Sequence, residues 1–370
     1  MLDRLDVVNF KAFADARIPL GGFTLLSGLN SAGKSTVLQA LALLRQSQVA
    51  GLLDDGTGSG FLLNGELVEL GTGRDVLHEN HIDTGGEGPQ IILSVVEDGI
   101  VHTWTAAYGQ ENDLLHLDSG TTHHSAGMFG PDFQYLKADR LAPSVSYPRS
   151  HEMAIRRGFL GCRGEHAVNF LRHRQDERLT SPQLHHPDAR STSLLDQTDA
   201  WMREICPGVN LQAATIEGTD LVRLGYRIGV AGLPTALSHR PTNVGFGLSY
   251  VLPIVLACLS AVPGSLILLE NPEAHLHPRG QTMMATLAAA AVASGAQLIV
   301  ESHSDHVLNG LRLAVKHGTL TDSAVKLLYF QRQRNGVEIL NPTLGPDGMI
   351  SDWPPGFFDE WEHSLDQLLG

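Results

Sequence analysis

The stretch Gly28-Leu-Asn-Ser-Ala-Gly-Lys-Ser-Thr36 follows the pattern G-x-x-x-x-G-K-[ST] of a phosphate-binding loop, or P-loop. Gly28 and Gly33 allow backbone angles that other residues avoid, and they let the chain approach a phosphate closely. The peptide N–H groups then form an anion site at a helix N-terminus. In such a loop Lys34 reaches the β- and γ-phosphates, and the hydroxyl of Ser35 is a ligand of Mg²⁺.

The sequence on both sides of this loop predicts the structure that a P-loop requires. Residues 22–27 have the pattern of a strand entering the loop. Residues 35–48 predict a helix leaving it, because their apolar residues recur at helical spacing. The alternative is a chance match in a glycine-rich surface turn, which the strand and the helix disfavour.

Composition limits the class of protein. The 370 residues include 26 Lys and Arg against 40 Asp and Glu, for a net charge of −14. This balance argues against a generally basic nucleic-acid surface, but it leaves open a local basic groove or a DNA contact made through a partner. Three scattered cysteines and a first segment without an apolar core predict a cytoplasmic protein, and no apolar run is long enough to span a membrane.

The chain before residue 150 predicts many strands. Residues 3–9 and 15–20 predict an antiparallel flap, with Lys11 at its turn. Lys11 could lie near a nucleotide, with a neighbouring phenylalanine under the base, or the turn could be an ordinary hairpin rim. Further strands are predicted at 62–71, 90–96, 100–107, 114–117 and 135–141.

After residue 150 the pattern of predicted helices and strands changes twice. Residues 150–235 predict a lid-like insertion, with helices near 165–175 and 192–205 and a hairpin of 209–216 with 221–230. Strands then alternate with helices, which implies a parallel sheet with crossover helices and an α/β fold. The alternating elements are a helix at 247–261, a strand at 266–270, a helix at 278–293, a strand at 297–301, a helix at 305–317 and a strand at 325–330. An amphipathic helix at 357–369 follows.

Two of these strands end in residues suited to nucleotide chemistry. The apolar strand 266–270 ends in Glu270, a position from which a carboxylate binds Mg²⁺ directly or through water. A second carboxylate, Glu273, can orient the attacking water. The strand 297–301 is followed by His303, which can bind the γ-phosphate and respond to its loss.

A fourth segment, Asn243-Val-Gly-Phe-Gly-Leu-Ser249, places two glycines and a serine at the start of an apolar helix. The N–H groups at a helix start form an anion site. The alternative is a simple N-cap, which Ser249 could also be.

Together these segments resemble the ABC-type head ATPases related to RecF, SMC and overcoming-lysogenisation-defect (OLD) proteins. The resemblance covers residues 1–340 and depends on the P-loop, the Gly245–Ser249 signature, ENPEAHLHP at 270–278 and ESHSDH at 301–306. More narrowly, the segments 135–143, 161–165 and 270–281 resemble stand-alone bacterial AAA-family ATPases with a C-terminal domain of unknown function. The implied parts are an ATPase head formed by 1–149 and 236–340, the insertion 150–235 and a tail at 341–370.

The resemblance implies a homodimer in which the P-loop of one subunit and the signature of the other enclose ATP. The residues that it implies for phosphate binding are Gly28, Asn30, Ser31, Gly33, Lys34, Ser35 and Thr36. Ser35 and Glu270 would hold Mg²⁺, and His303 would be the switch histidine. Gly245, Gly247 and Ser249 would contact the γ-phosphate in trans, while Gln46 is a candidate Q-loop residue.

The chain departs from this family at the acidic strand end. The family usually has Asp-Glu-Pro there, whereas this chain has Glu270-Asn-Pro-Glu273. The amide of Asn271 cannot take a proton from water at neutral pH. Either Glu273 is the general base, or hydrolysis is slow and the protein is an ATP-gated clamp. Histidines at 275, 277, 303 and 306 could also suggest zinc, but the family pattern already explains them.

Three functions therefore compete. The first is an ATPase that dimerises on ATP and regulates a partner encoded nearby, such as a nuclease, in phage defence or DNA maintenance. The second is a RecF-like clamp that binds DNA itself, which the net charge disfavours. The third is a nucleotide sensor that hydrolyses ATP slowly or not at all, which Asn271 favours.

Overall fold

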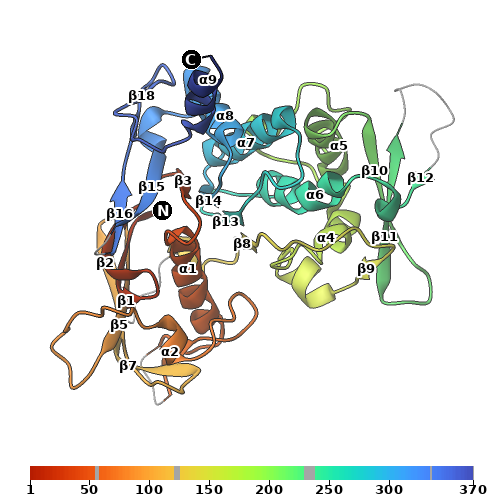
Figure 1. Cartoon of the computed structure of the whole chain (residues 1–370). Helices are drawn as coiled ribbons and strands as arrows, with labels where there is room; N and C mark the ends of the chain where they lie inside the picture. Colours follow the sequence, from red (N-terminus) through yellow and green to blue (C-terminus); the bar gives the residue numbers. More distant parts are fainter. Residues whose placement is uncertain (55–57, 121–125, 229–237, 334–335, 370) are drawn as a thin grey trace. The chain divides into compact units, whose positions relative to one another are not determined.

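The computed structural model describes residues 1–54, 58–120, 126–228, 238–333 and 336–369. The chain forms two compact units, coloured along the sequence in Figure 1. The first unit comprises Met1–Gly130, Ser323–Gly345 and Ile350–Gly370, and the second comprises Pro131–Asp322 and Pro346–Met349. The division of the chain at 149, 235 and 340 stays a prediction.

An antiparallel sheet dominates the first unit. Its strand order is β2-β1-β5-β6-β7-β4, and the register pairs Val7 with Ala16 on one side and with Leu93 on the other. The strands are β1 (Leu2–Phe10), β2 (Phe13–Pro19), β4 (Gly60–Leu62), β5 (Gln90–Glu97), β6 (Ile100–Ala107) and β7 (Leu114–Gly120). Alternate residues of β1 are buried, as in a sheet with one covered face. The predicted flap is an antiparallel hairpin.

A second group of strands in this unit carries the P-loop. The strand β3 (Phe23–Gly28) pairs in parallel with β15 (Val325–Gln333), which pairs antiparallel with β16 (Gly336–Leu340). The buried strand β3 leads through the loop to α1 (Lys34–Val49), so the predicted strand and helix both form. The unit also contains α2 (Gly73–Val76), α3 (Ala126–Phe129), the pair β17 (Thr343–Leu344) and β18 (Ile350–Ser351), and α9 (Glu360–Leu369).

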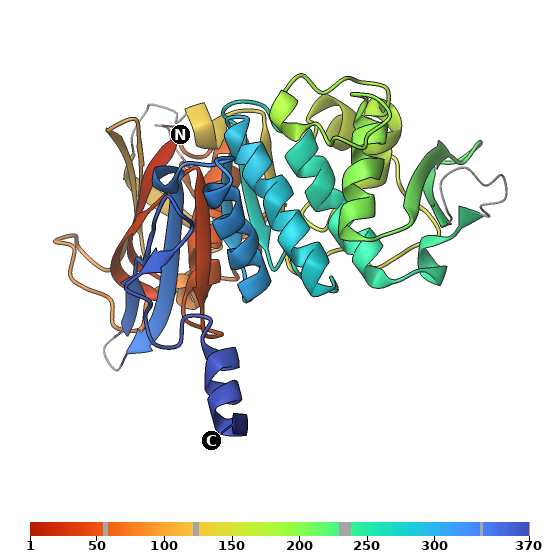
Figure 2. The ribbon, with the colours of Figure 1, turned by 90° about the horizontal axis from the view of Figure 1, so that it is seen from above.

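The second unit has a parallel sheet covered by helices. The strand β13 (Leu266–Glu270) lies between β8 (Phe133–Leu136) and β14 (Gln297–Glu301), with Glu270 opposite Glu301. The crossover helices are α6 (Phe246–Leu259), α7 (Pro278–Ala293) and α8 (Asp305–Lys316), and α7 packs between the other two (Figure 2). The alternation of strands and helices thus gives the predicted parallel pairing.

The rest of the second unit holds the segment predicted as a lid. It contains a π-helical turn (His151–Arg156), α4 (Ala167–Arg174), α5 (Leu194–Ile205) and a small sheet of β9 (Tyr147–Pro148), β10 (Val209–Thr215), β11 (Leu221–Ile228) and β12 (Ser238–His239). The short 3₁₀ turns are Pro182–Leu184, Pro241–Asn243 and Asp322–Ala324. Both predicted helices and the hairpin form. The end of the predicted insertion, at 229–235, lies outside the described residues.

Two strand predictions are wrong in extent. Residues 63–71 do not continue β4, because their backbone groups bond within the segment and to the Gln46 side chain. The strand β8 ends at Leu136, because the next residues turn toward the end of β13 and bond to it. Within the described part of the chain, no helix is long and apolar enough to cross a membrane.

Candidate functional site

The P-loop in the first unit has the backbone that its glycines allow. Gly28, Ser31 and Gly33 have φ angles of 132°, 61° and 98°. A Cβ atom on Gly28 would lie 2.3 Å from the carbonyl oxygen of Phe330, and one on Gly33 would lie 3.1 Å from the ring of Phe13. Both glycines are therefore required by backbone angle and by close packing.

The Lys34 side chain is enclosed by the loop and only 3% exposed. Its Nζ donates hydrogen bonds to the carbonyl oxygens of Gly28, at 3.0 Å, and Leu29, at 2.8 Å. A buried ammonium is costly unless its donors are bonded, and these carbonyls supply the bonds. The loop thus holds a cation beside its own N–H groups.

The start of α1 is open to an anion. Gly33 precedes the helix without a side-chain cap, and no acidic residue lies in its first turn. The first N–H groups of a helix have no partner within the helix and attract negative charge. The other residues predicted to bind phosphate lie around this helix start: Asn30 and Ser31 are exposed, Ser35 is partly exposed and Thr36 is buried.

The turn of the β1–β2 flap is built into the first unit. Lys11 has a φ of 49°, and burial lowers the pKa of its ammonium, while Asp75 opposes that shift. Phe10 and Phe13 on either side are buried, and the ring of Phe13 lies beside Gly33. These rings are occupied in the core, so they offer no free face to a base. The contact of Lys11 with a nucleotide stays a prediction.

The Gln46 side chain holds a loop of its own unit. Its Nε2 donates to the carbonyl of Leu62 at 2.8 Å, and its Oε1 accepts from the N–H groups of Leu67 and Val68 at 2.8 and 3.0 Å. The side chain is buried. The amide of Gln46 completes the backbone bonding of residues 62–68, and its role as the Q-loop residue stays a prediction.

The carboxylate of Glu270, at the end of β13, is fixed by one donor from β8 and one from the segment after it. The Tyr135 hydroxyl donates to Oε1, and the Ala138 N–H donates to Oε2 at 3.0 Å. Burial, and after it the charge of Glu270, raise the pKa of Tyr135 well above its usual value, so the phenol stays a donor. Each carboxylate oxygen keeps a second lone pair for another ligand.

The next residues form a turn whose acid has one oxygen without a partner. Asn271 has a φ of 42°, a left-handed angle that asparagine tolerates better than most residues, and its N–H donates to the carbonyl of Glu301. Glu273 Oε1 accepts from the His303 N–H at 2.9 Å. Glu273 Oε2 is buried and has no hydrogen-bond partner among the described residues. Such an oxygen is suited to a bound water or ligand.

Arg140 holds this turn, and sequence reasoning missed it. Its guanidinium donates to the carbonyls of Lys137 at 2.9 Å, Glu270 at 2.8 Å and Asn271 at 2.7 Å. The only available signal was an arginine five residues after Tyr135, within a segment quoted for resemblance.

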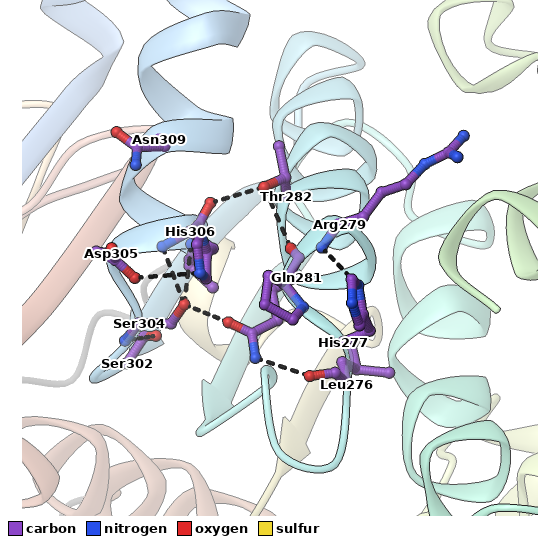
Figure 3. Close-up of polar contacts among 12 residues, drawn as sticks. Leu276, His277, Arg279, Gln281, Thr282, Ser302, Ser304, Asp305, His306 and Asn309 are labelled. Carbon is purple, nitrogen blue, oxygen red and sulfur yellow. Dashed lines mark hydrogen bonds and ion pairs between the residues drawn. The ribbon is translucent and has the colours of Figure 1, made fainter.

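The turns after β13 and β14 are tied together at the starts of α7 and α8 (Figure 3). Gln281 donates to the carbonyl of Leu276 and accepts from the hydroxyl of Ser304. Ser304 caps α8 by accepting from His306 N–H, and His277 caps α7. The His303 side chain is exposed beside this network. Across the described ranges, no three His, Cys, Asp or Glu residues converge as metal ligands.

The predicted signature is the start of α6 in the second unit. Gly245 precedes the helix without a side-chain cap, and a Cβ there would meet nothing within 4 Å. A Cβ on Gly247 would lie 2.6 Å from the carbonyl oxygen of His275, so only a glycine lets the turn that contains His275 pack this closely against α6. Phe246 between them is 53% exposed. The first turn of α6 therefore has accessible N–H groups.

Ser249 lies one turn further and faces inward. It is 8% exposed, and its hydroxyl is 3.4 Å from the hydroxyl of Tyr226 within the same unit. The predicted contacts of Ser249 and Gly247 with a γ-phosphate in trans stay predictions, but both residues are buried, and the exposed part of the signature is Gly245 with Phe246.

Family comparisons match three parts of the chain. Residues 1–81 match a family described as AAA ATPase domain, and residues 238–309 match one described as AAA domain, putative AbiEii toxin, Type IV TA system. Residues 320–368 match a protein family of unknown function, DUF3696. The first two matches place AAA ATPase sequence in both parts of the chain that carry the predicted nucleotide motifs, and they support the predicted ABC-type ATPase of the RecF, SMC and OLD group.

Solved structures agree with an ATPase-head fold. The SMC head domain from Pyrococcus furiosus, bound to the C-terminal domain of ScpA, is 11% identical with a TM-score of 0.51, over 100% of this chain and 99% of that chain. The SMC head from Thermotoga maritima is 13% identical with a TM-score of 0.44, over 92% and 98%. An SMC head bound to the C-winged helix domain of ScpA is 13% identical with a TM-score of 0.48, over 93% and 98%. The first of these supports the α/β fold.

No curated protein matches the chain. The first family match contains the P-loop, and the second contains the predicted signature, the acid turn after β13 and His303. The segment from Tyr135 to Arg140, which bonds to that turn, lies outside both matches.

Proposed function

We propose that this ABC-type ATPase binds ATP with Mg²⁺ through its P-loop and hydrolyses it slowly. The observation that carries the proposal is the P-loop itself, with left-handed backbone at Gly28, Ser31 and Gly33 and with Lys34 held against the loop carbonyls. Binding of ATP would exchange these carbonyls for phosphate oxygens as partners of the ammonium, which a charge-assisted bond favours. Asn30, Ser35 and Thr36 complete the proposed phosphate site, and Lys11 lies at its flap.

The donor groups present fit Mg²⁺. A hydroxyl at Ser35 and a carboxylate at Glu270 are the hard oxygen ligands that this ion prefers. Both oxygens of Glu270 already accept one hydrogen bond, so a water between the carboxylate and the ion also fits. When bound, the ion would neutralise phosphate charge. The protein would supply ligand orientation, which Tyr135 and Ala138 fix for Glu270.

We assign the general base to Glu273. Its Oε1 is fixed by the N–H of His303, and its buried Oε2 is without a partner among the described residues and can bind a water. Asn271, which has the left-handed φ angle of the turn, is not a candidate for the base, because its amide cannot take a proton from water. His303, with its exposed side chain, is the proposed switch residue. The competing sensor function predicts that wild-type turnover is slow or absent and that Glu273→Gln leaves it unchanged.

The start of α6 is the proposed trans site for ATP held by a second copy of the chain. The helix begins at the exposed Gly245 without a side-chain cap, so a γ-phosphate there would face the first N–H groups of α6, of which Gly247 supplies one from within the buried part of the turn. ATP binding would then bring two chains together. The same interaction would make hydrolysis dependent on protein concentration, because each site is completed only by a partner.

The trans site has a sharp test in Gly245→Arg. A Cβ atom there meets nothing within 4 Å, and the φ angle of −62° is one that arginine adopts. Light scattering of Glu273→Gln should show a larger particle with ATP than without it, and Gly245→Arg added to that variant should abolish the increase. The control is Gly88→Arg, which also has open space at its Cβ. An unchanged increase in both arginine variants would refute the trans site.

The proposal extends to a protein partner that the ATP-bound pair regulates, in phage defence or DNA maintenance. The P. furiosus SMC head binds a domain of a second protein, which is support by analogy only. Recovery of the product of a neighbouring gene in an ATP-dependent pull-down tests this; DNA affinity that rises with ATP and falls with salt would favour a clamp.

A further inference from the structure

Arg140 is an almost fully buried cation in the second unit. It is 2% exposed, and burial lowers the pKa of its guanidinium to about 10, although the carboxylates of Glu273 and Glu270 oppose that shift. It remains charged at neutral pH. Burial of a charge costs free energy unless hydrogen bonds compensate, so an apolar residue would serve better if this position only filled space.

The guanidinium connects two segments that are distant in the sequence. One nitrogen, Nη1, donates to the carbonyls of Lys137 and Glu270, and the other, Nη2, donates to the carbonyl of Asn271. The Asn271 N–H is bonded to the carbonyl of Glu301. Asn271 is thus fixed on both sides, and its left-handed angle directs the chain toward Glu273. A planar fork can bond carbonyls of successive residues at once, whereas the ammonium of lysine is a point charge.

Arg140 also touches the signature helix. Its guanidinium carbon lies 5.4 Å from the ring centre of Tyr250, within the range of a cation–π contact. The Tyr250 ring lies edge to face with His275 at 4.7 Å, and His275 lies 5.7 Å from Phe246. Tyr250 and Phe246 belong to α6, and His275 belongs to the turn after β13. Contiguous packing therefore connects the exposed start of α6 to Arg140.

We infer that Arg140 is a positioning residue that couples the start of α6 to the orientation of Glu273. This inference rests on the proposed function, in which a nucleotide of the second copy contacts that helix start. A shift of Phe246 and Tyr250 is passed to Arg140 by the cation–π contact. Arg140 then changes its bonds to the carbonyls of Glu270 and Asn271. The device makes the base competent only when the trans contact is made.

The first experiment measures ATP turnover in Arg140→Lys, with Arg163→Lys as the matched control. Arg163 is exposed and also bonds a carbonyl of this segment, that of Asp139. Arg140→Lys should lower kcat by about tenfold with KM for ATP within about twofold, because the phosphate site is untouched. In the Glu273→Gln background the same change should cost less than about twofold, since Arg140 acts through that carboxylate. The inference would be overturned if Arg140→Lys had the turnover of wild type. It would also be overturned if Arg140→Lys lowered kcat by a full tenfold in the Glu273→Gln background.

The second experiment uses hydrogen exchange and needs no turnover. Tyr250→Leu keeps the hydrogen bonds of Arg140 but removes both ring contacts of the proposed coupling, the cation–π contact with Arg140 and the edge-to-face contact with His275. Without nucleotide, exchange over residues 271–276 should be faster in Tyr250→Leu and in Arg140→Lys than in wild type, with exchange over the P-loop unchanged. Unchanged exchange at 271–276 in Tyr250→Leu would overturn the coupling, even where Arg140→Lys fails to fold.

These readouts separate the inference from the proposed function. If wild type shows neither turnover nor slower P-loop exchange with ATP, the proposed function fails, while the nucleotide-free exchange still decides the coupling. If wild type hydrolyses ATP, and if exchange over residues 271–276 is the same in Tyr250→Leu and Arg140→Lys as in wild type, only the inference about Arg140 fails.

Discussion

The P-loop in the first unit and the acid turn in the second unit are assembled in opposite ways. The P-loop bonds to itself: Lys34 reaches carbonyls only five and six residues away. The acid turn is held from a distance, by donors of Tyr135, Ala138 and Arg140 that lie 130 to 135 residues earlier in the chain. A local motif therefore defines the P-loop, whereas tertiary structure defines the acid turn.

This difference determines which substitutions should disturb the P-loop and which should disturb the acid turn. A substitution in the P-loop removes a group that the motif already names. In the acid turn, a substitution far away in sequence can displace the same oxygen as a substitution within the turn.

The largest effect is expected for Lys34→Ala. The proposed phosphate site loses its only P-loop cation, so affinity for ATP–Mg²⁺ should fall by at least about 100-fold, which is about 2.7 kcal/mol. Titration calorimetry measures it. Lys326→Ala is the matched control, because it removes a half-buried lysine of the same unit that lies in β15, outside the motif. An affinity within about threefold of wild type would exclude the P-loop as the nucleotide site.

The next effect is expected for Glu273→Gln in the acid turn. The amide preserves the acceptor for the His303 N–H but cannot take a proton. We expect kcat to fall at least about tenfold with ATP affinity nearly unchanged, the pattern of an interaction made only in the transition state. Wild-type turnover is itself expected well below a median of roughly 10 s⁻¹.

The control for that change is Glu217→Gln, which alters an exposed acid of the β10–β11 turn in the same unit. Normal turnover in Glu273→Gln would exclude this residue as the base and make His303 the next candidate.

Much of the fold was predictable because it depends on local pattern. The buried strands β3, β13 and β14 and the helices α1, α7 and α8 form within about two residues of their predicted positions, since apolar runs and caps define them. The loop at 63–71 was mistaken for a strand, because its partner is a side chain, Gln46, that no periodicity reveals. Arg140 was missed for the same reason: its meaning depends on which carbonyls lie beside it.

The smallest expected effect, at Asn271, separates backbone geometry from chemistry. The φ of 42° gives asparagine a structural reason to be there, apart from any role in hydrolysis. Asn271→Gly should be nearly neutral for stability, whereas Asn271→Glu should cost about 1 kcal/mol, because a longer side chain is strained at a left-handed angle. Thermal unfolding of the two variants measures this difference.

Turnover of Asn271→Glu then decides what the asparagine does for the enzyme. A glutamate there adds a carboxylate where relatives of the family have their base, so we expect kcat to rise by roughly two- to fivefold despite the strain. The gain should persist when Glu273→Gln is added, because the new carboxylate would act by itself. A destabilised protein with unchanged turnover would mean that position 271 serves only the backbone. A faster one would mean that the native chain is a slow, timed ATP switch because an amide occupies this place.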